Sequence, residues 1–215
     1  MGFLNNLFSI DMLIYRFPAI VLALTIHEYS HGRVAYAFGD PTAKNAGRLT
    51  LNPLMHLDVI GTLMLLVFQF GWAKPVPVNP YFFQGDRRKK VMYVSVAGPL
   101  SNLLQAIIVA ILLSLLVHFL PPRNNPFSIW FTNFLQYLIL INIVLAVFNL
   151  LPVPPLDGSK ILAGILPERY AYIIYQLERY GFIILIIAMF LGVFSAIISP
   201  VVYFIFHAIM GLVGL

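Results

Sequence analysis

The chain has 215 residues, of which 60% are hydrophobic and 10% are charged, so it has too little polar surface to cover a soluble globule of this size. Cysteine is absent, which excludes a disulfide framework and a zinc site built from thiolates. The net charge of +5 does not indicate nucleic acid binding, because the basic residues lie next to predicted membrane spans, where they report topology. We therefore predict an all-α membrane protein in which residues 1–215 form one domain with about five transmembrane helices.

The first predicted span covers residues 17–38 and ends at the turn signal Gly-Asp-Pro at residues 39–41. Its second half contains His27, Glu28 and His31 in the pattern H-E-x-x-H. Positions i and i+4 share one face of a helix, so the two histidines can bind one metal ion while Glu28 stands beside the open coordination position. This pattern is typical of zinc hydrolases.

The connection to the second span contains two unusual stretches. Residues 59–70 form an apolar run that is too short to cross a membrane at full thickness, so we expect it to be re-entrant or interfacial. Residues 71–80 read Gly-Trp-Ala-Lys-Pro-Val-Pro-Val-Asn-Pro, and this alternation of Pro and Val favours an extended, strand-like backbone. We predict a re-entrant β-like loop between the first and second helices.

The remaining spans are separated by prolines. The second covers residues 91–120 and is broken by Pro121 and Pro122, and the third covers residues 129–151. The third runs into a proline-rich stretch that must unwind the helix before Asp157. Residues 168–215 are predicted to form two helices that meet near residues 192–195, so the core of the domain is residues 15–165.

The basic residues predict the orientation of the chain in the membrane. Seven of the thirteen Lys and Arg residues lie between the first and second spans, which puts this connection in the cytoplasm and the N-terminus outside: Lys44, Arg48, Lys74, Arg87, Arg88, Lys89 and Lys90. The first and third spans then both end on the cytoplasmic side, which brings Asp157 to the level of the histidine pair. A metal site there would lie within the membrane but near the cytosol.

A catalytic zinc site with two histidines needs a third protein ligand, and Asp157 is the leading candidate. Unwound backbone at membrane depth is tolerated only where protein or a water-filled cavity surrounds it, and the prolines before Asp157 create such a segment. The alternative is an Asp-Gly turn that simply follows a span. The other acidic residues are expected outside, in loops, in a basic run or at an interface: Asp11, Asp40, Asp58, Asp86, Glu168 and Glu178.

These residues predict amide hydrolysis. One zinc ion per chain, held by His27, His31 and Asp157, would lower the pKa of a bound water from 15.7 toward about 7, and Glu28 could take its proton as it attacks a carbonyl. The substrate must itself lie in the membrane and be locally extended, because a helical amide is shielded by its own hydrogen bonds. Residues 71–80 could supply a strand edge that holds it.

The sequence from His27 to His31, followed by Asn149-Leu150-Leu151-Pro152-Val153-Pro154-Pro155-Leu156-Asp157-Gly158, resembles the site-2 protease family of intramembrane zinc metalloproteases. Three further stretches match this family: Asn52-Pro53 through His56, Asp58 and Gly61-Thr62; residues 71–80; and Ala97-Gly98-Pro99-Leu100-Ser101-Asn102. The resemblance covers residues 15–165, in a short form without a PDZ or CBS domain.

The resemblance implies a zinc metalloendopeptidase of the cell membrane that cleaves a membrane protein in or near its transmembrane segment. It implies Glu28 as the catalytic base and three zinc ligands, His27, His31 and Asp157. It also implies that Asn149 contacts the substrate or transition state and that residues 71–80 are the family's membrane re-entrant β-loop. The expected substrate-binding residues of this loop are Gly71, Trp72, Val76 and Val78.

Some alternatives stay open from the sequence. Asn102, within the second span, fits an interhelical hydrogen bond and a substrate contact equally well. A metal transporter is disfavoured because transit does not need Glu28, and an inert membrane chaperone is disfavoured because all four chemical residues are present. The expected partners are the lipid bilayer and a membrane protein substrate; the sequence indicates neither an oligomeric state nor a regulatory trigger.

Overall fold

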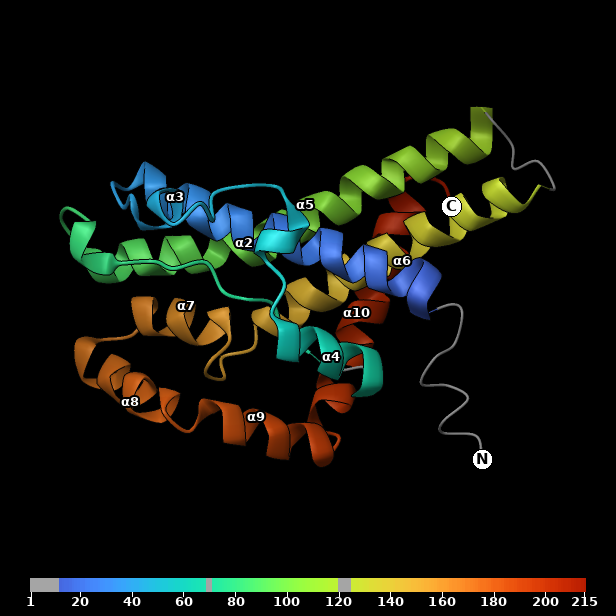
Figure 1. The fold of residues 1–215 in the computed structure, drawn as a ribbon. Helices are drawn as coiled ribbons and strands as arrows, with labels where there is room; N and C mark the ends of the chain where they lie inside the picture. Colours follow the sequence, from blue (N-terminus) through green and yellow to red (C-terminus); the bar gives the residue numbers. More distant parts are fainter. Residues whose placement is uncertain (1–11, 69–70, 120–124) are drawn as a thin grey trace.

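The computed structural model describes residues 12–68, 71–119 and 125–215, and every regular element in these ranges is helical (Figure 1). The predicted all-α class is confirmed at this level. A π-helical turn, Met12–Arg16, leads into α2 (Phe17–Ala37), which ends one residue before the predicted boundary. Pro18 lies in the first turn of α2, at its junction with the π-helical turn.

Helices α5 (Arg87–Phe119) and α6 (Pro126–Asn149) pack against α2 and against each other in the centre of the molecule (Figure 1). Within the described residues, these two helices are long and apolar enough to cross a membrane. The break predicted at residues 121–122 lies outside the described residues. The other three predicted spans remain predictions. The core between the helices contains fully buried alanines, which let the backbones approach closely: Ala19, Ala23, Ala106 and Ala110.

The connection from α2 to α5 contains α3 (Thr42–Asn45), α4 (Val59–Phe68) and two 3₁₀ turns, Pro53–Met55 and Pro80–Phe82. Residues 69–70, the end of the predicted apolar run, lie outside the described residues. Residues 71–80, which we call the extended segment, run from α4 toward the start of α5 without forming a strand (Figure 1).

The predicted β-like loop is therefore an extended chain with one isolated antiparallel bridge, between Leu57 and Ala73. Prolines along the segment lack the N–H that a longer ladder would need. The start of this segment lies very close to α4: a Cβ on Gly71 would overlap the carbonyl oxygen of Gly61, and a Cβ on Gly61 would overlap the carbonyl oxygen of Trp72.

The C-terminal part differs from the two predicted helices. Asp157 opens α7 (Asp157–Ile165), and then three helices follow: α8 (Glu168–Glu178), α9 (Gly181–Phe190) and α10 (Val193–Leu212). The unpredicted break between α8 and α9 coincides with a close approach of Gly181 to Pro154, where a Cβ would come within 2.7 Å of the Pro154 carbonyl. The predicted boundary near residue 192 is confirmed, because Gly192 has φ +69° and caps α10.

Candidate metal centre

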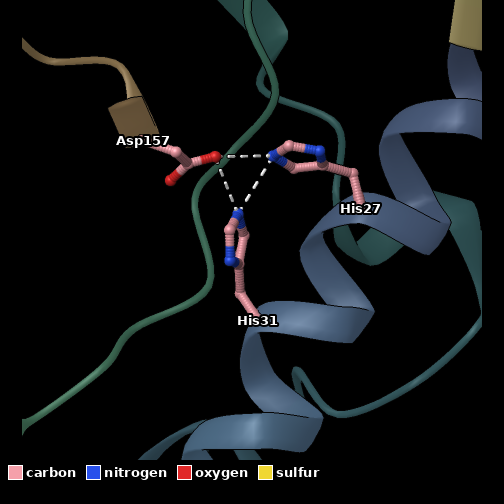
Figure 2. A group of neighbouring side chains, drawn as sticks. All are labelled: His27, His31 and Asp157. Carbon is pink, nitrogen blue, oxygen red and sulfur yellow. Dashed lines mark hydrogen bonds and ion pairs between the residues drawn. The ribbon is translucent and has the colours of Figure 1, made fainter. Parts of the chain in front are cut away.

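Three side chains that are far apart in the sequence converge on one point (Figure 2). His27 and His31 project from successive turns of α2, and Asp157 projects from the first turn of α7. The Nε2 atoms of the two imidazoles lie 3.0 Å apart, and Oδ2 of Asp157 lies 3.2 Å from each of them. All three residues are buried, and within the described residues this is the cluster whose ligand atoms could hold a metal ion.

Each imidazole is oriented by a hydrogen bond from its other nitrogen. Nδ1 of His31 donates to the carbonyl oxygen of Val94, 2.7 Å away, and Nδ1 of His27 donates to Oδ1 of Asn102, 2.6 Å away. The orientation of the Asn102 amide is fixed in turn, because its nitrogen donates to the Ala23 carbonyl and to Oδ1 of Asn142. Val94 and Asn102 both belong to α5, so this helix sets the direction of both imidazoles.

These hydrogen bonds determine which ring nitrogens carry protons. Because both Nδ1 atoms donate, both Nε2 atoms of the neutral imidazoles present lone pairs. Two lone pairs and a carboxylate oxygen therefore face one another at 3.0 to 3.2 Å, an arrangement that is unfavourable without a cation between them. Ligands of a tetrahedral zinc ion with bonds near 2.1 Å lie roughly 3.4 Å apart, so this donor set fits zinc with a small outward shift of the side chains.

The loop before α7 delivers the carboxylate of Asp157: Gly158 packs directly on the carbonyls of Leu150 and Leu151, where a Cβ would overlap them. Packing thus requires the glycine of this Asp-Gly pair, and the aspartate is the candidate ligand.

Gly98 of α5 makes the space that the imidazoles occupy, which the sequence analysis missed. A Cβ at this position would lie 2.6 Å from Nε2 of His27 and would overlap Nε2 of His31. The sequence signal was the Gly98-Pro99 pair within a span, which indicates close packing but not the partner.

Glu28 lies beside the cluster without joining it. Its Oε2 accepts a hydrogen bond from the backbone N–H of Val76, 2.8 Å away, in the extended segment. The side chain of Glu28 is only partly buried and borders two cavities, in agreement with a group that can exchange protons with water or substrate.

The two cavities adjoin the cluster on different sides and share His27, Glu28 and Asn149 in their lining. One, of about 380 Å³, extends along Val76 and Val78 toward α5. The other, of about 450 Å³, is more apolar and extends along Gly71 and Trp72 toward α9. The predicted residues of the extended segment and Asn149 thus border space next to the cluster. Lys160, which the sequence analysis did not select, borders both cavities.

Asn102 is the exception among the predicted substrate-binding residues. It is fully buried between α2, α5 and α6 and borders neither cavity. Of the two alternatives, the structure favours the interhelical hydrogen bond, and the prediction of a substrate contact is not supported. The physical reason is that its amide hydrogen-bonding groups are occupied by His27, Ala23 and Asn142.

The arrangement is that of a metal-dependent hydrolase, and comparison with known proteins assigns the family. Residues 123–193 match the model of peptidase family M50. The chain is 42% identical over 193 residues to a Bacillus subtilis protein named "Putative zinc metalloprotease YwhC", covering 90% of this chain and 88% of that protein.

Two more distant relatives carry similar names. "Putative zinc metalloprotease Rip2" of Mycolicibacterium smegmatis is 30% identical, with 86% of this chain and 70% of that protein covered. "Putative zinc metalloprotease MJ0611" of Methanocaldococcus jannaschii is 31% identical, with 72% of each chain covered. No solved structure gives a significant match. The chain belongs to peptidase family M50, a family of zinc metalloproteases.

Proposed function

We propose that this protein is an intramembrane zinc metalloendopeptidase that cleaves a membrane protein in or near its transmembrane segment. The observation that carries the proposal is the convergence of three metal-binding atoms from α2 and α7 with Glu28 beside them. Helix-borne histidines in a segment this apolar are expected to face the protein interior and to have a function. In this proposal His27, His31 and Asp157 hold one zinc ion per chain.

The chain's own residues supply proton transfer and orientation. Zinc, when bound, polarises a carbonyl oxygen and lowers the pKa of bound water. Glu28 accepts a proton from the attacking water as the new carbon–oxygen bond forms, and it delivers that proton to the leaving nitrogen as the carbon–nitrogen bond breaks. Asn149, at the end of α6, borders both cavities and is proposed to hydrogen-bond the substrate carbonyl.

The proposed substrate is an extended stretch of a membrane protein, lying along Gly71, Trp72, Val76 and Val78. The more apolar cavity suits hydrophobic side chains of a transmembrane sequence. The proposed topology keeps about five spans and an external N-terminus, so that the cluster lies near the cytoplasmic side of the cell membrane. The distribution of basic residues and the apolar character of α5 and α6 support it.

The first test measures zinc in the purified protein. We expect about one zinc per chain, lost in the His27→Ala, His31→Ala double variant and weakened in Asp157→Ala. His118→Ala and His207→Ala are matched controls, because these exposed histidines form hydrogen bonds within their own helices and lie outside the cluster. Full zinc retention in the double variant would falsify the site.

The second test separates chemistry from binding. Glu28→Gln should keep zinc and the fold but lose cleavage of a transmembrane substrate by about 10² or more. Glu168→Gln, an exposed residue of α8, should retain full activity. Wild-type turnover in Glu28→Gln would be incompatible with its role as the base.

A further inference from the structure

Two buried charges in the connection that follows α2 have no part in the proposed chemistry. Asp40, in the turn after α2, is fully buried, and Arg48, after α3, is 7% exposed. Within the described residues neither forms a salt bridge; the Asp86–Lys89 pair is the only carboxylate–ammonium contact. Burying a charge is costly unless the charge is paired or hydrogen-bonded, so the partners of these two residues are informative.

Both residues hold the extended segment. Nη2 of Arg48 donates to the carbonyl oxygens of Lys74 and Pro75, at 2.7 and 3.4 Å. Oδ2 of Asp40 accepts from the N–H of Asn79 at 2.6 Å, while its Oδ1 accepts from the N–H and the hydroxyl of Thr42. Charged partners make these hydrogen bonds stronger than those between neutral groups.

We call Arg48 and Asp40 the two tethers of the extended segment. The residues that they hold flank the contact with Glu28. Val76, whose N–H donates to Glu28, follows the residues held by Arg48 and precedes the residue held by Asp40 by three positions. It also lies between Pro75 and Pro77, whose rings fix their φ angles. Its side chain is buried over Gly32 of α2. The position of the Val76 N–H is therefore restrained by the tethers on both sides of it in the chain and by the packing of its side chain on α2.

We propose that Asp40 and Arg48 are positioning residues that act through the Val76 N–H to fix the carboxylate of Glu28. This inference rests on the proposed function, because it assigns the orientation of the proposed base. A segment with a single β-bridge has little structure of its own, so two charged tethers replace the hydrogen-bonded neighbour strand that would otherwise hold it. The free oxygen of Glu28 then keeps one direction toward the shared cavity space.

The simplest alternative is that both residues merely stabilise the connection between α2 and α5. The two ideas differ in how the variants combine with Glu28→Gln. If Asp40 acts through Glu28, its substitution should lower activity no further in the Glu28→Gln variant, where the base is already absent. If Asp40 only stabilises the fold, its substitution should lower activity by the same factor with Glu28 and with Gln at this position.

The experiment uses the full-length protein in detergent or nanodiscs, with Asp40→Asn and Arg48→Met. The Asn variant keeps the shape of Asp40 but presents an amide that cannot accept from both Thr42 and Asn79. We expect kcat to fall about 10- to 100-fold on a transmembrane substrate and on a short extended peptide alike, with unchanged zinc content. In the Glu28→Gln background the same substitutions should change residual activity less than twofold.

A readout independent of activity is amide hydrogen exchange of residues 71–80. Exchange at Val76 should accelerate in Asp40→Asn and Arg48→Met, and remain as in the wild type in two controls, Asp86→Asn and Arg169→Met. Asp86 is exposed and accepts a backbone N–H at the start of α5, and Arg169 is exposed on α8.

The outcomes separate the two proposals. Unchanged kcat in both tether variants, or equal losses with and without Glu28, overturns the positioning role while leaving the protease assignment intact. An active Glu28→Gln variant overturns the protease mechanism itself, whatever the tether variants do. A loss confined to the transmembrane substrate would show that the tethers serve substrate presentation and not the base.

Discussion

The two sides of the metal centre are built in different ways. On the side of α5, the imidazoles are held by hydrogen bonds to Val94 and Asn102, which are themselves fixed within packed helices. On the opposite side, Glu28 is held by Val76 in a segment without a sheet. The comparison teaches that the geometry of the two imidazoles, the proposed ligands, follows from helix packing, whereas the geometry of Glu28, the proposed base, depends on individual side-chain tethers. Damage to the first side should remove the metal, and damage to the second should remove turnover only.

The largest effect is expected from Gly98→Ala. Alanine normally favours a helix over glycine by about 0.5–1 kcal/mol, so any loss would come from the new methyl group. That group would lie 2.6 Å from Nε2 of His27, and zinc should be lost with essentially all activity. Zinc content by elemental analysis checks this, with Gly211→Ala as control because open space surrounds that position. A zinc-replete Gly98→Ala protein would contradict the described packing.

An intermediate effect is expected from Asn102→Ala, which removes the acceptor for Nδ1 of His27. Zinc affinity should fall about 10- to 100-fold, because partners that orient a metal ligand typically contribute this much. Asn102→Asp keeps an acceptor and should lose less. Chelator competition measures the affinity, and Thr132→Ala, whose hydroxyl bonds only to its own helix, is the control. Equal affinity in Asn102→Ala and wild type would contradict the orienting role of this side chain.

The smallest effect is expected on the opposite side, from Gly32→Ala. The added Cβ would lie 3.1 Å from Cγ1 of Val76, so the extended segment must shift by a few tenths of an ångström. We expect kcat to fall about 3- to 10-fold with zinc unchanged. Adding Val76→Ala removes the contacting methyl and should restore much of the loss. A fall in the zinc affinity of Gly32→Ala would show that the α5 side and the extended-segment side of the centre are not independent.

The sequence alone predicted those parts of the site that follow from helix periodicity or from a sequence motif. Helix periodicity placed His27 and His31 on one face, and charge distribution placed Asp157 at their level. It did not reveal that Val76 contacts Glu28, because a backbone N–H has no residue signature. It also missed the break before Gly181, since nothing in the local sequence shows that Pro154 packs there.

Asn102 illustrates a different limit, because the sequence left two roles equally open. A polar residue in an apolar helix signals a polar partner, but the sequence does not say whether that partner is substrate or protein. The choice depends on the rotation of α5 relative to α2 and α6, which is set by packing of small residues such as Ala23 and Ala106. Tertiary contacts decide such cases.

The prolines of the extended segment also bear on encounters between copies of the protein. In an extended chain, successive N–H groups point to opposite sides, so Pro75 and Pro77 remove two consecutive donors from the side facing away from the Val76 N–H. Two such edges could not form a continuous hydrogen-bonded ladder across these positions. Exposed strand edges invite aggregation, and proline is one of the means by which proteins prevent it. The segment can thus remain partly exposed beside the cavities with less tendency to pair with a neighbouring copy.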